Sequence, residues 1–277
     1  MWIKKKEIEQ LSEFVKGYSS GEELDIRVNK EGSFNILKND IYALVNTKNE
    51  QIKAVETERD SLSDYMADIS HQLKTPITSM MIMADLLEEA EPEKQTEFIH
   101  NIQVSLNKME WLVGALLKMA KLDSGTAILQ KEKIFIKELI LHSAEPLAIS
   151  MDLHGVKLCL NGNDTDSFQG DFGWSAEAIT NILKNGIEHM ENGGNLYVSW
   201  SEKSVYSEIE IEDEGNGISD EELPHIFERF YRGKTARHSG FGIGMAMAQS
   251  IFAKQNGTIK AQNREEGGAK FVIHVRK

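Results

Sequence analysis

Hydrophobic side chains recur at helical spacing along two long stretches of this chain. From Ile36 onward, apolar residues fall on two seven-residue rows that lie three or four positions apart, which is typical of a coiled-coil seam. The rows contain Val45, Ile52, Met66 and Leu73 in one case, and Ile41, Val55, Leu62 and Ile69 in the other. A second periodic stretch follows the helix breaker at 91–93 and runs from about residue 94 to the glycine stop at 123–125. Two antiparallel helices bury only a narrow seam, so the pattern predicts a helical hairpin that pairs with a second copy as a four-helix bundle.

Beyond Gly125 the pattern changes to short β-like runs that alternate with helical segments. The runs lie at 133–136, 156–160, 195–200, 207–212, 257–262 and 270–275, and the helical segments at about 137–150, 172–190 and 242–255. Short turns join several runs, which predicts an α/β sandwich with a mostly antiparallel sheet. We therefore expect a multidomain protein with a linker at 1–35, a helical-hairpin domain at 36–125 and an α/β domain at 126–277.

Composition limits which partners and which kinds of cross-link or membrane segment the chain can have. The formal net charge of −13 argues against nucleic acid as the main partner, because phosphate would be repelled. The single cysteine, Cys159, excludes an internal disulfide framework, and its apolar neighbours predict a buried strand position. No stretch approaches the roughly 20 apolar residues needed to span a bilayer. The start combines Trp2 with the basic residues Lys4–Lys6, which is typical either of a segment just inside a membrane or of an ordinary charged N-terminus.

A histidine in the first helix is the first candidate for chemistry. Each helical residue turns about 100°, so His71 points roughly 200° away from the seam residues Ile69 and Leu73. Pro76 lacks the N–H that would bond the preceding turn and is expected to bend the helix, while Thr75 stands one turn beyond His71 on the same face. A neutral imidazole can act as a nucleophile. An inert surface histidine and a metal ligand are the alternatives, and no His or Cys stands three or four residues away to help hold a metal.

Polar residues in the α/β domain form two further motifs. Asn181, Asn185 and His189 share one helix face, and such amide oxygens can coordinate Mg²⁺ and lie near phosphate. Asp213 ends a strand and opens the glycine-rich turn 213–217, where a carboxylate can accept a hydrogen bond from an exocyclic amine. Surface asparagines and a plain hairpin turn are the alternative interpretations.

A third motif combines glycines with basic residues. The sequence 239–246 places three glycines before a helix, where backbone N–H groups can hold phosphate. Taken alone this pattern is weak, and it does not follow a strand as a dinucleotide-binding motif would. Upstream, the aromatic-rich segment 226–233 carries Arg229 and Arg232, which can meet phosphates or simply form a solvated basic loop.

Together these motifs resemble the H, N, G1, F and G2 boxes of bacterial two-component sensor histidine kinases, in the family order and at family-like separations. The quoted residues are 71–76, 181–189, 213–217, 227–232 and 240–244, and the resemblance covers roughly residues 36–277. It implies a dimeric helical hairpin that carries the phosphorylated histidine, followed by an ATP-binding α/β sandwich like that of gyrase and certain chaperone ATPases. It also implies a homodimer at the cytoplasmic face of the cell membrane, anchored there in the parent protein.

The resemblance assigns roles to the candidate residues. His71 would attack the γ-phosphate of ATP, and the phosphoryl group would pass to an aspartate in the receiver domain of a response regulator. Asn185 would hold Mg²⁺, with Asn181 beside it and His189 near the phosphates, and Asp213 would bind the adenine amino group. The other implied residues are Gly215 and Gly217 in the pocket floor, Arg229 or Arg232 against the phosphates, and Gly240, Phe241 and Gly242 in the lid.

Several positions depart from the family pattern. Gln72 stands where an acid usually follows the histidine, so autophosphorylation is expected to work but to be slower than with glutamate there. Thr75 matches the family's phosphatase position, which makes phosphatase activity toward the regulator plausible. Glu188 and His238 replace residues common in the nucleotide site and lid.

Two other functional classes remain as alternatives. A hydrolysing or clamp-type ATPase of the same superfold would carry a glutamate where Asn181 stands, and an amide cannot act as a general base. A non-catalytic scaffold would be expected to have decayed motifs, whereas all five motifs are intact.

Overall fold

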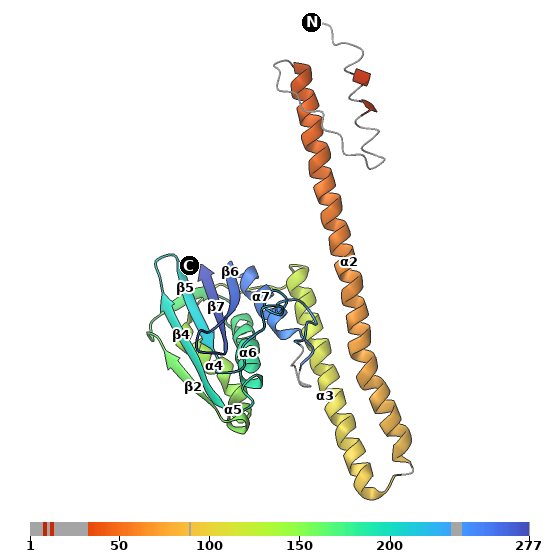
Figure 1. Ribbon diagram of the computed structural model, residues 1–277, viewed down its shortest axis with the longest axis vertical. Helices are drawn as coiled ribbons and strands as arrows, with labels where there is room; N and C mark the ends of the chain where they lie inside the picture. The colour runs from red at the N-terminus through yellow and green to blue at the C-terminus, as the bar shows by residue number, and fades with distance from the viewer. Residues whose placement is uncertain (1–7, 10–11, 14–32, 89, 234–239, 277) are drawn as a thin grey trace. The chain divides into compact units, whose positions relative to one another are not determined.

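Figure 1 shows the computed structural model of the chain. The structure describes residues 8–9, 12–13, 33–88, 90–233 and 240–276. The expectations for Trp2, for Lys4–Lys6, for most of the linker 1–35 and for His238 therefore lie outside the described residues. Within the described ranges, no helix combines the length and apolar character that a membrane crossing requires.

The chain divides into two compact units, Met1–Ile69 and Ser70–Lys277, and each is described by itself. The first unit contains most of helix α2, which spans Ser33–Leu87 and so continues into the second unit. Its seam residues Ile52 and Val55 are 52% and 63% exposed. A helix that shows this much apolar surface needs a partner helix, as its sequence predicts.

The second unit begins with the end of α2, which turns back into helix α3 (Pro92–Asp123). Pro92 opens α3, where its missing N–H removes no hydrogen bond. The side chain of Gln95 closes the turn, because its Nε2 donates to the carbonyls of Leu87 (3.2 Å) and Ala90 (3.0 Å). The predicted helical hairpin is confirmed in this unit.

The α/β part of the second unit contains two sheets. A five-stranded sheet has the order β2-β4-β5-β7-β6, and β1 pairs with β3 in a separate two-stranded sheet. The strands are β1 (Glu132–Phe135), β2 (Val156–Asn161), β3 (Ser167–Gly170), β4 (Gly194–Glu202), β5 (Tyr206–Glu212), β6 (Gly257–Asn263) and β7 (Ala269–Arg276). Only β2 and β4 pair in parallel among the described strands, so the expectation of a mostly antiparallel sheet is confirmed.

Helices cover one face of the larger sheet (Figure 1). They are α4 (Ile136–Ala144), a 3₁₀ turn (Glu145–Leu147), α5 (Ala148–His154), α6 (Phe172–Glu188) and α7 (Gly244–Lys254). Alternate residues of β5, including Ile209 and Ile211, are buried against them, whereas Glu208, Glu210 and Glu212 occupy the other face. This second face carries ion pairs, including those of Lys270 Nζ with Glu210 and Glu212.

Two local expectations were wrong. The helix expected over 137–150 is interrupted at Glu145–Leu147, because Pro146 cannot continue an α-helix without losing a backbone bond. Cys159 lies on β2 as predicted but is half-buried rather than buried, because β2 is an edge strand and this side chain faces the open side of the sheet. There Sγ lies 3.9 Å from Asn195 Oδ1.

Candidate active site

His71 lies on α2 with its side chain exposed, while Ile69 and Leu73 on either side of it are half-buried. The hydroxyl of Thr75 donates to the backbone carbonyl of His71 at 3.3 Å, which places this hydroxyl one helical turn further along. The predicted orientation of the histidine is therefore confirmed. An exposed imidazole can meet a reactant that arrives from outside the helix.

A separate hollow in the second unit encloses about 210 Å³. It collects side chains from α6, from the turn after β5, from residues 222–233 and from the start of α7. Eight of the residues predicted for the site line it: Asn181, Asn185, His189, Gly217, Arg232, Gly240, Phe241 and Gly242. His71, Gln72 and Thr75 do not line this hollow.

Helix α6 supplies one wall because its two faces differ in polarity. Ile179, Leu183 and Ile187 are at most 1% exposed and fix the helix on the sheet, so Asn181 and Asn185 turn toward the hollow. The side chain of Asp171 accepts a hydrogen bond from the backbone N–H of Trp174 at 2.9 Å and caps the start of α6. Gly244 lies close to this wall, and a Cβ there would stand 3.2 Å from Asn181 Oδ1, so the amide would have to shift by a few tenths of an ångström to accept it.

Asp213 follows β5 directly and is 3% exposed. Its Oδ1 accepts hydrogen bonds from the backbone N–H groups of Gly215 (2.9 Å) and Ala269 (3.1 Å). Burial raises the pKa of this carboxyl group above its usual range, although the two backbone bonds act in the opposite direction. Gly215 is required beside it, because a Cβ would lie 2.8 Å from the carbonyl oxygen of His189.

The glycine-rich segment 240–244 is held against the aromatic segment before it. Phe230 adopts a positive φ of 60° and donates its backbone N–H to the carbonyl of Gly242 at 2.9 Å. Gly242 has a φ of +70°, and a Cβ there would lie 2.5 Å from the carbonyl oxygen of Tyr231. Only glycine fits this contact, so the two motifs depend on each other for their conformation.

Helix α3 contributes a residue to the pocket that the sequence did not predict. The Trp111 ring stacks on Phe241 with centroids 5.8 Å apart and planes 16° from parallel, and Lys184 Nζ lies 5.6 Å from the Trp111 ring centre. Lys184 also lines the pocket, and its position between Asn181 and Asn185 could have indicated it. Nothing in the sequence indicated Trp111, which lies 70 residues before Asn181.

Arg229 takes a position different from that of Arg232. Arg232 lines the pocket, whereas Arg229 Nη2 pairs with Asp123 Oδ1 of α3 at 2.8 Å and is not among the lining residues. The pocket thus offers two cations, Lys184 and Arg232, together with amide groups and a nearby buried carboxylate. Such a set suits an anionic ligand that also carries an amine donor.

Two domain families match this chain. The family described as "His Kinase A (phospho-acceptor) domain" matches residues 61–125, and the family described as "Histidine kinase-, DNA gyrase B-, and HSP90-like ATPase" matches residues 171–277. His71 falls in the first range, and the Asn181, Asp213 and Gly242 motifs fall in the second.

Curated relatives align along most of the chain. The sensor protein SphS of Synechococcus elongatus is 28% identical over 244 residues, which cover 81% of this chain and 58% of that protein. The signal transduction histidine-protein kinase BaeS of Escherichia coli is 25% identical over 230 residues, which cover 82% of this chain and 49% of that protein. The chain thus spans about half the length of the curated relatives it matches.

Solved structures share the fold. The Acinetobacter baumannii histidine kinase AdeS matches with a TM-score of 0.60 and 21% identity, covering 74% of this chain and 97% of that one. The histidine kinase ThkA, solved in complex with the response regulator protein TrrA, matches with a TM-score of 0.66 and 19% identity, covering 83% of this chain and 66% of that one. At these identities the likeness concerns the fold alone.

Proposed function

Because this chain belongs to the two-component sensor histidine kinases, we propose that it binds ATP in the pocket beside α6 and transfers the γ-phosphoryl group to His71. The observation that carries the proposal is the presence, in one chain, of an exposed helical histidine and of a separate pocket lined by amides and cations. The buried carboxylate of Asp213 lies near this pocket but is not one of its lining residues. The histidine supplies a nucleophile and the pocket suits a nucleotide.

The reaction is a displacement at the γ-phosphorus. The Nε2 lone pair of His71 forms the new N–P bond, the bond from phosphorus to the β–γ bridging oxygen breaks, and ADP leaves with that electron pair. The imidazolium then releases its Nδ1 proton to water. Catalysis of such transfers depends mainly on positioning and on neutralising charge. We assign charge neutralisation to Lys184 and Arg232, which line the pocket.

Asn185 is the residue we propose for Mg²⁺, with Asn181 beside it. In phosphate sites Mg²⁺ keeps several waters and takes one or two protein oxygens besides the phosphates, and a pair of amides one helical turn apart fits that requirement. When bound, the ion would neutralise charge on the β- and γ-phosphates. Asp213 is proposed to accept a hydrogen bond from the adenine 6-amino group, with His189 nearer the phosphates.

ATP hydrolysis by the same pocket is the second candidate. An activating base would be needed near the γ-phosphate, and the α6 face toward the pocket carries Asn181 and Asn185. Glu188 also lines the pocket, but its carboxylate is engaged in an ion pair with Lys184 Nζ at 3.7 Å. These features favour transfer to His71 over transfer to water.

The experiment that tests the proposal is phosphorylation with ATP labelled at the γ-phosphate. Wild type is expected to acquire label that is labile in acid and stable in base, whereas His71→Ala is expected to acquire none. His100→Ala is the matched control, because His100 is another exposed histidine of the helical hairpin. Label that persists in His71→Ala, or that disappears in His100→Ala, would contradict the assignment of His71.

A response regulator and a second copy of the chain are the partners we propose. ThkA was solved with the response regulator TrrA, which supports an aspartate in a receiver domain as the next phosphoryl acceptor. Apolar side chains left exposed on α3 support the homodimer. The hydroxyl of Thr75, one turn from His71, is proposed to orient the hydrolytic water in any phosphatase reaction toward the regulator.

We also propose a location at the cytoplasmic face of a membrane, with the anchor supplied elsewhere in the parent protein. The names of the relatives, which are sensor proteins and sensor kinases, support this proposal. The residues that indicated it in the sequence, Trp2 and Lys4–Lys6, lie outside the described part of the structure.

A further inference from the structure

The turn from Asp213 to Ile218 leaves the sheet and receives support from the hairpin between β6 and β7. Asp213 is buried and its Oδ1 is occupied by two backbone N–H groups, so Oδ2 is the oxygen available to a ligand. Oδ2 lies on the side of α6, 3.8 Å from the place where a Cβ of Gly186 would stand. Its direction therefore depends on how the backbone at Asp213 is held.

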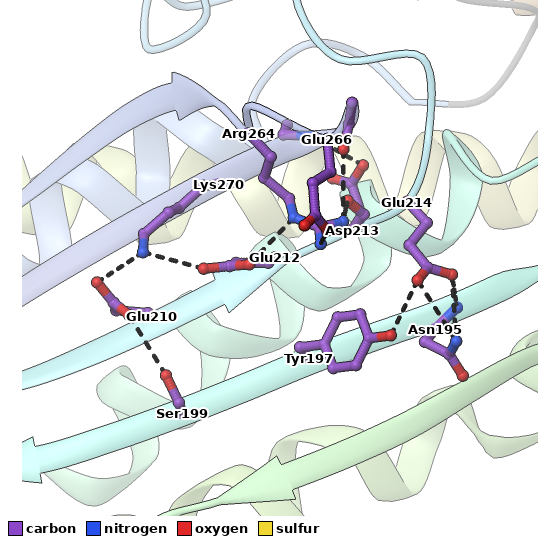
Figure 2. Close-up of polar contacts among 12 residues, drawn as sticks. Asn195, Tyr197, Ser199, Glu210, Glu212, Asp213, Glu214, Arg264, Glu266 and Lys270 are labelled. Carbon is purple, nitrogen blue, oxygen red and sulfur yellow. Dashed lines mark hydrogen bonds and ion pairs between the residues drawn. The ribbon is translucent and has the colours of Figure 1, made fainter.

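Arg264 holds the backbone at the start of this turn. Figure 2 shows its guanidinium between Glu212 and Asp213. Nη1 donates to the backbone carbonyl of Asp213 at 2.9 Å, and Nε pairs with Glu212 Oε2 at 3.0 Å. The side chain is only 13% exposed, and its guanidinium lies 5.5 Å from the Tyr197 ring centre. Hydrogen bonds from a charged donor at this burial are stronger than exposed ones.

Asn263, the residue before Arg264, holds the other end of the turn. Its Oδ1 accepts the backbone N–H of Ile218 at 2.8 Å, and its Nδ2 donates to the carbonyl of the same residue at 2.6 Å. The amide thus pairs with Ile218 as a neighbouring strand would. Ile218 and Gly217 both line the pocket, so this pair of bonds fixes part of the pocket wall.

The hairpin also approaches Asp213 without any side chain between them. Gly268 has a φ of +94°, and a Cβ there would overlap the carbonyl oxygen of Asp213. Asp213 N–H in turn donates to the carbonyl of Ala269 at 2.9 Å. Contacts from residues 263–269 therefore reach both ends of the turn 213–218.

We propose that Arg264 and Asn263 are positioning residues of the adenine subsite, which fix the two ends of the turn 213–218 so that Asp213 meets the 6-amino group of adenine. The inference rests on the proposed function, because it takes ATP as the ligand. A site that recognises a single amino group needs the hydrogen-bond acceptor held within a fraction of an ångström. A shift of the turn should therefore abolish the preference for nucleotides that carry the 6-amino group before it unfolds the domain.

The test compares ATP with purine riboside triphosphate, which lacks only the 6-amino group. Dissociation constants are measured by calorimetry on the full chain. Wild type is expected to prefer ATP by about tenfold, as for one hydrogen bond to a charged acceptor. Arg264→Met should bring the two nucleotides to within about twofold by weakening ATP alone, and Arg264→Lys should restore part of the preference. In the kinase reaction KM for ATP should rise while kcat stays the same.

Lys270→Gln is the matched control. Lys270 Nζ pairs with the same Glu212 at 2.9 Å, through Oε1, whereas the Asp213 carbonyl takes its side-chain hydrogen bond from Arg264. Like Arg264→Met, the Lys270→Gln substitution removes a cation that pairs with Glu212. It should nevertheless leave unchanged the preference for ATP over purine riboside triphosphate. Where Arg264→Met does not fold, Asn263→Ala supplies the same comparison from the other end of the turn, since it leaves no charge unpaired.

The possible results distinguish the positioning role of Arg264 and Asn263 from the proposed recognition of adenine by Asp213. A wild-type preference that survives both Arg264→Met and Asn263→Ala, or an equal loss for both nucleotides, would overturn the positioning role alone. Equal affinity of wild type for the two nucleotides would overturn the adenine contact of Asp213 and the positioning role together.

Discussion

At the scale of single residues, we expect Gln72 to limit how well His71 can carry positive charge. An amide oxygen can accept the Nδ1–H of the imidazole, but it cannot offset the charge that develops when Nε2 attacks. We expect Gln72→Glu to raise the autophosphorylation rate by about tenfold, equivalent to about 1.4 kcal/mol of barrier. The rate is measured under single-turnover conditions at saturating ATP.

Gln103→Glu is the control for that prediction, because it makes the same chemical change at an exposed position of α3. It should leave the rate unchanged. An unchanged or lower rate in Gln72→Glu would show that position 72 does not stabilise the imidazolium.

Replacing Asp213 by asparagine should stabilise the folded chain but weaken the binding of ATP. Burial raises its pKa in the folded chain, so its contribution to stability is present at low pH and is lost as pH rises through that raised pKa. Asparagine keeps the Oδ1 acceptor for both backbone bonds but carries no charge. We therefore expect Asp213→Asn without nucleotide to melt above wild type at pH 8, with the difference shrinking toward pH 4, and to bind ATP at least tenfold more weakly.

Differential scanning calorimetry across that pH range checks the sign. The prediction fails if the gap in melting temperature widens on acidification. At this scale the sequence predicted eight of the residues that line the pocket, because each motif is local and its residues are neighbours on one helix face or in one turn. The chemical roles of these residues stay predictions. Arg264 and Asn263 escaped notice because their contacts with Asp213 and Ile218 arise only when the β6–β7 hairpin folds back on β5.

At the scale of elements, Gln255 joins the end of α7 to the start of α6. It is 8% exposed; its Oε1 accepts the backbone N–H of Asp171 at 2.7 Å, and its Nε2 donates to Ser175 Oγ at 3.2 Å. We expect Gln255→Leu to lower the free energy of unfolding by about 2 kcal/mol, because the part-buried N–H of Asp171 and the buried hydroxyl of Ser175 both lose a hydrogen-bond partner. Urea denaturation measures the change.

Gln262→Leu is the control for this element-scale effect, since Gln262 is exposed on β6. It should change the unfolding free energy by less than about 0.5 kcal/mol. Equal effects of the two substitutions would show that the buried amide does not link the helices.

Helix and strand positions were largely predictable from periodicity, and the exceptions have physical causes. The sequence did not predict strand β3 (Ser167–Gly170), because Phe168 is its single large apolar residue and the strand therefore has no alternating pattern of apolar and polar residues. Its pairing with β1 exists only in the folded domain. Pro146 could have indicated the break in the helix after Ala144. The helical spacing of apolar residues on both sides of Pro146 nevertheless favoured a continuous helix.

At the scale of the whole molecule, the hairpin carries an apolar stripe that one chain leaves uncovered. Ile99, Leu106 and Val113 stand seven residues apart on α3 and are 48%, 51% and 44% exposed. A seven-residue repeat of this kind is the seam of a helix bundle. We expect Leu106→Glu to convert a dimer into monomers at micromolar concentration, as measured by light scattering.

Lys108→Glu is the matched control, because Lys108 lies about 200° around the helix from Leu106 and is exposed. It should leave the dimer intact although it changes the charge more. A wild type that is monomeric, or a Leu106→Glu variant that stays dimeric, would contradict the predicted bundle. The domain boundaries near residues 35 and 125 stay predictions of the sequence.

The stack of Trp111 on Phe241 gives the molecule an optical property of its own. An indole in the wall of the pocket, 5.8 Å from a second ring and 5.6 Å from an ammonium group, emits light whose intensity and wavelength depend on those neighbours. Anything that fills the hollow changes the polarity around that ring. The protein thus contains a native fluorophore in the wall of its proposed ATP pocket, and occupancy can be followed in unlabelled protein from the emission that Trp111→Phe removes.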